Sequence, residues 1–306
     1  MKVAIIGSGA MGSLYGGKLS EKNDVYLIDV WHQHIDTINK EGLTTIENEG
    51  NKIKSYPKGF YSSSGLPIMD LVLIFVKSIN TKESIMQSIN LFGPNTIVLT
   101  LQNGYGNDLD IMEAVKAENV IVGTTNHGCT IEAPGIIYHA GSGFTTIGSV
   151  AGNKQTAEMV AAILSDSGFE VKINENIQEL IFHKLLINTG INAITAIFNV
   201  DNEMIRKDPN LWSISKKIVI EAIEISKLKG LNFDQEEIFR DIEGVAIATA
   251  KNHSSMRTDV LKKRQTEIDK INGAFVAIAK ANGADAPYNE IVTEMVKFLE
   301  SQYLSQ

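Results

Sequence analysis

The first chemical feature of the sequence is a glycine-rich loop that directly follows its first apolar run. The six residues read G-x-G-x-x-G and are Gly7, Ser8, Gly9, Ala10, Met11 and Gly12. The first glycine of such a loop permits a tight turn, the second lets backbone amides approach a pyrophosphate, and the third allows close helix–strand packing. The helix that follows offers the anion its N-terminal amides. The hexapeptide predicts a dinucleotide site, against the alternative of a glycine-rich turn without a ligand.

An acidic residue stands where the ribose of such a dinucleotide is recognised. Asp29 ends the second apolar run, about 20 residues beyond the loop, and is followed by Val30, Trp31 and His32 rather than by an arginine. A carboxylate accepts hydrogen bonds from a ribose 2′-hydroxyl and repels a 2′-phosphate. The residue therefore favours NAD(H) over NADP(H). The alternative is that Asp29 caps a turn and points away from the ligand.

A second chemical feature is a polar stripe on the otherwise apolar segment 178–199. Lys184, Asn188 and Asn192 recur at a spacing of four, which places them on one face of a helix. Burying an unpartnered polar group costs about 1–3 kcal/mol, and burying a charge costs more, so the stripe suits a polar pocket. A lysine in a partly desolvated pocket can act as a general acid toward a developing alkoxide. The alternative is a solvent-facing stripe, for which asparagine is a poor helix former.

Short apolar runs in the first half predict the strands that position the glycine loop. Continuous apolarity is typical of strands covered on both faces, as in a parallel sheet. The block 136–147, which contains Gly141, Ser142 and Gly143, predicts a hairpin or strand pair. The other predicted strands are residues 3–6, 25–28, 71–76, 97–101, 120–123 and 169–173.

Helical periodicity replaces these runs after about Asn174. The predicted helices cover residues 178–199, 212–228, 234–252, 257–281 and 290–303. We therefore predict an α/β fold in two domains. Residues 1–174 form a Rossmann-type, doubly wound sheet that binds a dinucleotide, and residues 175–306 form an all-α substrate domain.

Composition narrows the classes of function. The 306 residues include 36 acidic and 28 basic ones, for a net charge of −8, which argues against nucleic-acid binding. The single cysteine, Cys129, excludes an intrachain disulfide, favours a reducing compartment and, with six histidines, argues against a closed zinc site. No uninterrupted apolar run approaches the ~18–20 residues that span a bilayer. We expect a cytoplasmic protein with no membrane, metal or nucleic-acid partner.

Together these motifs resemble the ketopantoate reductase (2-dehydropantoate 2-reductase) family over essentially the whole chain. The lysine–asparagine helix combined with the Thr-Glu-Ile-Asp sequence at 266–269 is the specific part of the match. The resemblance implies that hydride from NAD(P)H reduces the ketone of a small 2-oxo acid, ketopantoate, to D-pantoate, a step in pantothenate biosynthesis. Besides residues 7–12, the matching segments are 76–77, 101–104, 123–125, 184–188, 191–192, 254–256 and 266–273.

The resemblance also implies roles for single residues. Lys184 matches the family's general acid, and Glu267 matches the carboxylate that positions lysine, substrate and cofactor. Asn103 matches a residue between nicotinamide and substrate, and Lys77 matches one near the adenosine half. Cys129 lies where a loop backbone approaches the cofactor, and its thiol is assigned no chemistry. The positions that match substrate-binding residues are Asn103, Asn188, Asn192, Asn202 and Ser255.

Two of these residues have a simpler alternative. Ser255 could be the N-cap of the helix that follows it. Glu267 could be a solvated charge paired with Lys263 or Lys270 at helical spacing.

Two other functions stay open. Well-known family members use NADPH and carry a basic residue after the second strand. Some members of the superfamily resemble this chain better at Asp29, and these are NAD-linked dehydrogenases of branched or aromatic D-2-hydroxy acids. A nucleotide-sensing scaffold without chemistry is the second alternative, and the intact polar stripe argues against it. The long apolar helices of the second half could bury a homodimer interface.

Overall fold

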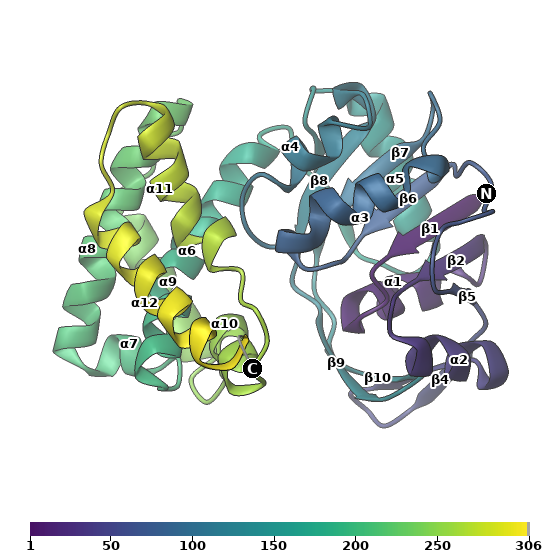
Figure 1. Ribbon diagram of the computed structural model, residues 1–306, viewed down its shortest axis with the longest axis horizontal. Helices are drawn as coiled ribbons and strands as arrows, with labels where there is room; N and C mark the ends of the chain where they lie inside the picture. The colour runs from purple at the N-terminus through teal and green to yellow at the C-terminus, as the bar shows by residue number, and fades with distance from the viewer. Residues whose placement is uncertain (305–306) are drawn as a thin grey trace. The chain divides into compact units, whose positions relative to one another are not determined.

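The computed structural model describes residues 1–304, and the chain divides into two compact units (Figure 1). One unit comprises Met1–Gln102 and Asn107–Ile177, and the other comprises Asn103–Gly106 and the chain from Gln178 onward. The loop 174–176, which contains the predicted boundary, leads directly into α6 (Ile177–Phe198). The four residues Asn103–Gly106 belong with the helices of the second unit, although the α/β unit surrounds them in sequence.

An eight-stranded sheet forms the centre of the α/β unit, in the order β12-β11-β8-β7-β6-β1-β2-β5. Neighbouring strands run parallel except β8 and β11. The predicted α/β class is confirmed, and the buried faces of β6 and β7 explain their continuous apolar sequences. The strands are β1 (Lys2–Ile6), β2 (Asp24–Ile28), β5 (Lys58–Phe60), β6 (Leu71–Ile74), β7 (Ile97–Thr100), β8 (Val120–Thr125), β11 (Thr145–Ser149) and β12 (Val171–Ile173).

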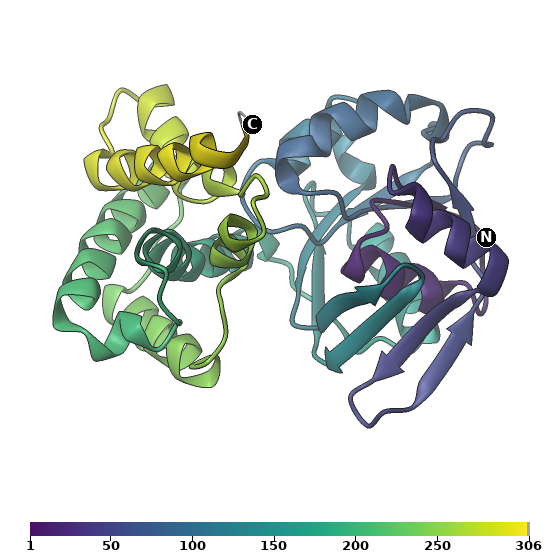
Figure 2. The same cartoon turned by 60° about the horizontal axis from the view of Figure 1, so that its bottom comes forward.

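A second, four-stranded sheet in the order β4-β3-β10-β9 belongs to the same unit (Figure 2). Helix α1 (Ala10–Leu19) packs against strands of both sheets, so the segment after the glycine loop is covered on two sides. The sequence analysis missed most of this sheet because β9 alternates between exposed and half-buried residues and β4 is mostly exposed. The strands are β3 (Leu43–Glu47), β4 (Lys52–Ser55), β9 (Gly128–Ala133) and β10 (Ile136–Gly141).

The predicted strand pair at residues 136–147 is wrong. Strand β10 lies in the small sheet and β11 in the large one, so the glycine-rich segment 141–143 crosses between sheets. Gly143 is required there because a Cβ at this position would lie 2.7 Å from the carbonyl oxygen of Asn126. Tyr15 of α1 secures the start of β11, since its buried hydroxyl lies 2.6 Å from the Thr145 hydroxyl.

The remaining helices of the α/β unit are short. They are α2 (His32–Glu41), η1 (Ser78–Asn80), α3 (Thr81–Gln87), η2 (Ile89–Leu91), α4 (Asn107–Met112), η3 (Ala117–Asn119) and α5 (Lys154–Asp166).

The second unit contains no strand among its described residues, 103–106 and 178–304, which confirms the predicted all-α class. Helix α6 supplies much of its core through side chains such as Phe182, Leu186 and Ile194. Within residues 1–304, α6 is also the one helix long and apolar enough to cross a bilayer, and 61% of that apolar stretch is buried inside the protein. The other helices are α7 (Met204–Lys207), α8 (Pro209–Ser226), η4 (Lys227–Lys229), α9 (Gln235–Ala248), α10 (Ser255–Leu261), η5 (Ile268–Lys270), α11 (Asn272–Ala281) and α12 (Pro287–Leu304).

The single helix predicted over 257–281 is wrong, because the chain forms α10, a loop, η5 and α11 there. Lys263 adopts a left-handed conformation with φ 53°. The Lys263 amide donates to the Val260 carbonyl and the Arg264 amide to the Asp259 carbonyl, the pair of bonds that ends a helix in a Schellman motif. Glycine usually occupies the left-handed position of this motif. A lysine there gives no stop signal in the sequence, and the periodic pattern continues through the break.

Candidate active site

The glycine loop of residues 7–12 connects β1 to α1 as predicted from its sequence. Gly7 has φ 94°, and a Cβ there would lie 2.5 Å from the Val76 backbone nitrogen. A Cβ at Gly12 would lie 1.9 Å from the Gly7 carbonyl oxygen, so close packing of α1 demands glycine. Gly9, the N-cap of α1, faces open space instead. The loop is therefore tight at both ends and accessible in the middle, where an anion would meet the amides of α1.

The Ser8 peptide group of this loop is fixed on both sides. Its amide donates to Asp29 Oδ2 at 2.6 Å, and its carbonyl accepts from the Ser13 hydroxyl at 2.8 Å. Behind Ser13 stands the buried His34, whose Nδ1 accepts from the Gly135 amide at 3.0 Å. The neutral His34 ring then carries its proton on Nε2 and donates it to Ser13 Oγ at 3.0 Å. Burial lowers the pKa of His34, which keeps the ring in this neutral form.

Asp29 caps a turn, as the alternative interpretation expected, and also holds the glycine loop. Its Oδ1 accepts from the Trp31 amide at 2.9 Å, as a turn-capping aspartate does, while Oδ2 holds the loop. The same residue lines a pocket of about 310 Å³, together with Gly7 and Asn80. None of the 14 residues that line this pocket is a lysine or arginine, and Glu83 adds a second carboxylate.

The other two residues predicted near the cofactor are close to this region of the α/β unit. Lys77 directly follows Val76, which lines the Asp29 pocket, and is itself half-buried outside the lining. Cys129 on β9 approaches the glycine loop, with its Sγ 3.4 Å from the Ala10 carbonyl oxygen. Burial raises the pKa of the Cys129 thiol to about 12, so the thiol stays protonated and unreactive.

The polar stripe of α6 is not a solvent-facing surface. Asn192 is buried with 6% of its surface exposed, and Lys184 and Asn188 are half-buried on the same helix. Burial lowers the pKa of the Lys184 ammonium, and the negative charge of Glu267 opposes this shift. The stripe therefore presents one cation, kept charged by a carboxylate, next to two carboxamides.

The structure removes one of the two helical partners, Lys263, that the alternative interpretation gave to Glu267. It lies at the start of η5, after a loop at 262–267 that follows the end of α10. The left-handed Lys263 follows the end of α10, so Lys263 and Glu267 do not lie four residues apart on one helix. Lys263 and Glu267 are four residues apart in the sequence, but no helix runs through both of them to bring their side chains together.

The N-cap of α10 is Ser254 rather than Ser255. The buried Ser254 hydroxyl accepts from the Arg257 amide at 3.1 Å and from the Thr195 hydroxyl at 2.8 Å. Ser255 is the first residue of the helix and its side chain is exposed. The capping alternative for Ser255 is therefore wrong.

Asn202 is buried with one hydrogen-bonding atom unused. Its Nδ2 donates to the Thr249 hydroxyl at 2.9 Å, and 6% of the residue is exposed. Its Oδ1 is buried and has no hydrogen-bond partner among residues 1–304. An orphaned buried acceptor is costly, and such atoms are found where a ligand or water completes the bonding.

Asn103 is carried by the short segment that joins the helical unit. The Tyr105 amide donates to the Lys270 carbonyl at 2.9 Å, and the Tyr105 ring packs edge-on against Phe182 of α6. These contacts attach the segment to η5, which begins directly after Glu267, and to α6, which carries Lys184. The sequence analysis assigned Asn103 to the first domain, and Tyr105, which secures it, gave no signal there.

Comparison with known proteins identifies the family of this chain. A model of the family described as ketopantoate reductase PanE/ApbA matches residues 3–152, and the corresponding C-terminal model matches residues 176–300. The chain belongs to the ketopantoate reductase family.

Relatives of this family resemble the chain over nearly its whole length. The 2-dehydropantoate 2-reductase of Halobacterium salinarum is 33% identical over 302 residues, 98% of this chain and 99% of the relative. That of Pyrococcus horikoshii is 34% identical and covers 98% of each chain. Among solved structures, D-mandelate dehydrogenase with NADH and anilino(oxo)acetate is 30% identical, with a TM-score of 0.92 and 99% coverage of both chains.

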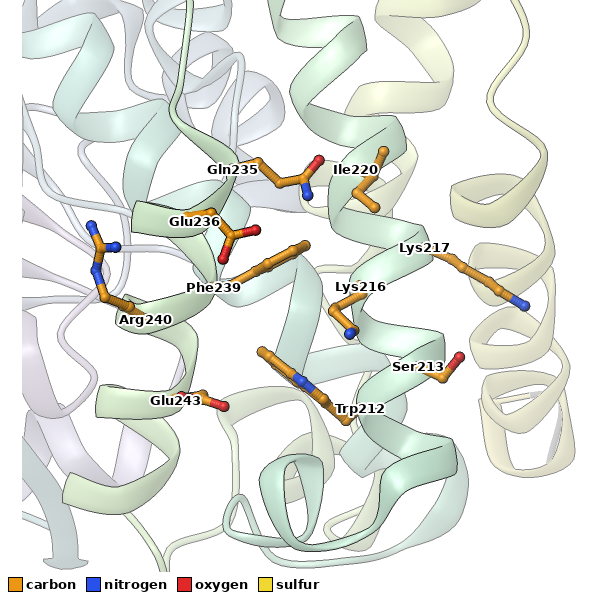
Figure 3. Close-up of a pocket in the computed structure, with 10 residues that line it drawn as sticks. All are labelled: Trp212, Ser213, Lys216, Lys217, Ile220, Gln235, Glu236, Phe239, Arg240 and Glu243. Atoms are coloured by element: carbon orange, nitrogen blue, oxygen red, sulfur yellow. The ribbon is translucent and has the colours of Figure 1, made fainter.

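A separate pocket of about 480 Å³ lies between α8 and α9 and contains none of the residues matched to the ketopantoate reductase family (Figure 3). The Trp212 and Phe239 side chains point between the two helices, whereas Lys217 and Arg240 extend away from them. Its lining includes three basic residues and two glutamates. This mixture of charges on an open surface does not select a 2-oxo acid.

His183, next to Lys184 in sequence, is also outside the reductase motifs. Its Nε2 lies 2.9 Å from Asp241 Oδ2 on α9, and Glu237 one turn earlier adds a third ligand-type atom within 4.8 Å. The hydrogen bond to Asp241 accounts for His183 as a contact between α6 and α9.

The attachment of Asn103 to η5 can be tested through two neighbouring glycines. Both Gly104 (φ 89°) and Gly106 (φ 87°) are left-handed, so alanine is strained at either position. A Cβ at Gly104 would also lie 2.8 Å from Lys270 Cβ and 2.9 Å from its carbonyl oxygen, whereas at Gly106 the nearest atom is the mobile Lys270 Nζ at 3.7 Å. We expect Gly104→Ala to lower the free energy of unfolding by about 1–3 kcal/mol more than Gly106→Ala in urea denaturation. Equal losses would mean that the segment does not pack on η5.

Proposed function

We propose that this protein reduces the ketone of 2-dehydropantoate (ketopantoate) to D-pantoate with a nicotinamide cofactor. The observation that carries the proposal is the buried Lys184 of α6 in a chain of the ketopantoate reductase family. Burial lowers the pKa of its ammonium, and the negative charge of Glu267 opposes that shift. A cation held in this way suits an electrophilic carbonyl that becomes an alkoxide during reduction.

The residues of the helical unit supply the acid and the binding groups. Lys184 donates a proton from Nζ to the carbonyl oxygen as negative charge develops there, and Glu267 keeps that ammonium protonated until transfer. Asn188, Asn192 and the exposed Ser255 hydroxyl offer donors for the carboxylate of the 2-oxo acid. These contacts bind the carboxylate and polarise the ketone, and together they orient the ketone carbon for hydride attack.

The α/β unit fits a dinucleotide. When bound, the nicotinamide supplies the hydride of the reduction. The glycine loop offers its amides beside the open space at Gly9, and the Asp29 pocket is placed at the carboxyl ends of β1 and β2, where dinucleotides bind in such sheets.

The charges of this pocket support NAD(H) over NADP(H). The Asp29 carboxylate uses one acceptor site of each oxygen on a backbone amide and keeps others for ribose hydroxyls. A 2′-phosphate would meet the carboxylates of Asp29 and Glu83 and no lysine or arginine in the lining. Like charges at this range are repulsive, and phosphate recognition normally uses arginine or lysine.

The unpartnered acceptor of Asn202 supports ketopantoate as the 2-oxo acid. Ketopantoate carries a hydroxyl group in addition to its ketone and carboxylate. Asn202 Oδ1 is buried and requires a donor, which that hydroxyl can provide. Branched or aromatic 2-oxo acids without a hydroxyl leave the atom unsatisfied.

The second candidate is an NAD-linked D-2-hydroxy acid dehydrogenase with the same catalytic lysine. The observation in its favour is the likeness to D-mandelate dehydrogenase, whose solved structure contains NADH and anilino(oxo)acetate. Both activities use a 2-oxo acid, so the substrate side chain decides between them.

We further propose a cytoplasmic location, because the single buried thiol of Cys129 suits a reducing compartment. We also propose a homodimer through the apolar helices of the second unit, which sedimentation or light-scattering measurements would test.

Replacing the proposed acid tests the reaction itself. Lys184→Ala should lower kcat for ketopantoate reduction by about 10²–10⁴, because no other group supplies the proton at that position. Lys217→Ala, which removes an exposed lysine of α8 from the same unit, is the matched control and should retain kcat. Near-normal turnover of Lys184→Ala would remove lysine from the mechanism.

Initial rates with the two cofactors test the account of Asp29. We expect kcat/KM for NADH to exceed that for NADPH by about tenfold or more, since ~1.4 kcal/mol of repulsion gives this ratio. Asp29→Asn should raise the NADPH-to-NADH ratio, and Glu83→Gln should raise it less because Glu83 does not hold the glycine loop. A wild-type preference for NADPH would contradict the account while leaving the reductase intact.

The role of Asn202 is tested by comparing substrates with and without a hydroxyl. Asn202→Ala should lower kcat/KM for ketopantoate by about tenfold, the value of a buried hydrogen bond, with little change for 2-oxoisocaproate or benzoylformate. Thr249→Val removes the partner of Asn202 Nδ2 but keeps Oδ1, so it should preserve the preference. A wild-type enzyme that prefers benzoylformate would establish the second candidate instead.

A further inference from the structure

The last helix of the chain carries a buried carboxylate that no part of the proposed mechanism uses. Glu300 of α12 has 7% of its surface exposed. Its Oε1 accepts a hydrogen bond of 2.6 Å from the backbone amide of Thr266. Thr266, itself 1% exposed, immediately precedes Glu267. The carboxylate therefore holds the Gln265–Thr266 peptide group, one residue before Glu267, whose charge acts on Lys184.

The rest of the loop 262–267 is attached to the same helix and to α10. Tyr303, one turn after Glu300, donates from its hydroxyl to the Arg264 carbonyl at 3.0 Å. The Arg264 side chain returns to Asp259 of α10, with Nε 3.7 Å from Oδ1. Thr266 Oγ1 accepts from the Ile268 amide at 3.2 Å, which starts η5. The loop has no helix of its own and depends on these side chains for its conformation.

Charged and titratable groups near Glu300 include Tyr303 on its own helix, whose hydroxyl group is affected by the charges of both Glu300 and Asp259. Asp259 of α10 in turn pairs with Arg264 of the loop. Burial, with smaller contributions from Glu300 and Asp259, raises the pKa of Tyr303 to about 12. Tyr303 therefore remains a hydroxyl donor through the neutral range, and the amide of Thr266 is the hydrogen-bond donor that the structure gives to Glu300.

A buried carboxylate is an expensive way to accept one hydrogen bond unless the bond itself has a function. Charge-assisted bonds to a backbone amide are shorter and about twice as strong as neutral ones. A strong, short bond fixes the direction of the Gln265–Thr266 peptide group, and hence the place of the Thr266 Cα. Thr266 is the residue that directly precedes Glu267, and its hydroxyl also accepts from the Ile268 amide on the other side of Glu267.

We propose that Glu300 is a positioning residue for the Glu267–Lys184 pair, acting through the Thr266 amide. The proposal rests on the roles given to Lys184 and Glu267 in the proposed function. It assigns to the C-terminal helix the task of holding Glu267 at the distance from which its charge keeps Lys184 protonated. Glu300 touches neither substrate nor cofactor in this role.

The experiment compares Glu300→Ala with Glu300→Gln, which loses the charge but keeps an oxygen that can accept from Thr266. Glu294→Ala, an exposed glutamate on the same helix, is the matched control. The first readout is the pKa of Lys184, from nuclear magnetic resonance titration of protein with 13C-labelled lysine, assigned by comparison with Lys184→Ala. The second is the pH profile of kcat with ketopantoate and NADH.

We expect Glu300→Ala to lower the Lys184 pKa by about one pH unit, because an opposite charge at short range is worth ~1–3 units and would be displaced. The alkaline limb of kcat should then move to lower pH by the same amount, since the acid must be protonated. Glu300→Gln keeps a weaker, neutral acceptor for the Thr266 amide, so it should shift both readouts by clearly less than Glu300→Ala, and Glu294→Ala should leave both near wild type.

Two results would overturn the proposal. One is a Glu300→Ala variant that is less stable but keeps the Lys184 pKa, which would make Glu300 a purely structural contact. The other is a shift of the Lys184 pKa in Glu300→Gln as large as that in Glu300→Ala, which would mean that the charge of Glu300 acts directly rather than through Thr266. The titration needs no turnover, so a protein that fails to reduce ketopantoate, which would refute the proposed function, still decides the role of Glu300.

Discussion

The helical unit depends on keeping one ammonium group charged on an apolar helix. Helix α6 packs most of its length into the core, and burial alone would drive Lys184 toward its neutral form. Glu267 opposes that change, and its position follows from the break between α10 and η5. In a continuous helix over 257–281, the helical repeat would instead set the direction of the Glu267 side chain. The left-handed Lys263, which ends α10, is therefore a requirement of the charge pair as well as a detail of the fold.

The α/β unit solves a comparable problem with hydrogen bonds to the backbone of its glycine loop. A phosphate-binding loop must keep amides available without letting the chain collapse on itself. The Ser8 peptide is held by Asp29 on one side and by Ser13 and His34 on the other, and His34 in turn accepts from Gly135 just before β10. This chain of bonds explains why α1 is covered by a second sheet. The last hydrogen bond of this chain comes from Gly135, which lies between two strands of the small sheet.

The sequence predicted what rests on local chemistry and missed what rests on long-range pairing. The glycine loop, the central parallel strands and the α6 stripe follow from spacing alone. The strand pair at 136–147 was wrong because pairing partners are separated widely in sequence, with β10 beside β3. Ser255 was offered as a cap because adjacent serines cannot be told apart before the start of α10 is known. The contact of Glu300 with Thr266 spans 34 residues and leaves no periodic signal.

Specificity within this superfamily must come from groups beyond the catalytic stripe. In the proposed mechanism, Lys184 and the asparagines of α6 recognise features that every 2-oxo acid shares, namely its ketone and carboxylate. They cannot distinguish ketopantoate from the substrates of a D-2-hydroxy acid dehydrogenase. A group that discriminates must be left unsatisfied by the wrong substrate, because an unpaired buried acceptor costs about 1–3 kcal/mol. Asn202 Oδ1 has this property in the present structure, since Thr249 occupies its amide nitrogen and leaves the oxygen for a donor. In our proposal, the substrate preference therefore depends on an atom that takes no part in the chemistry.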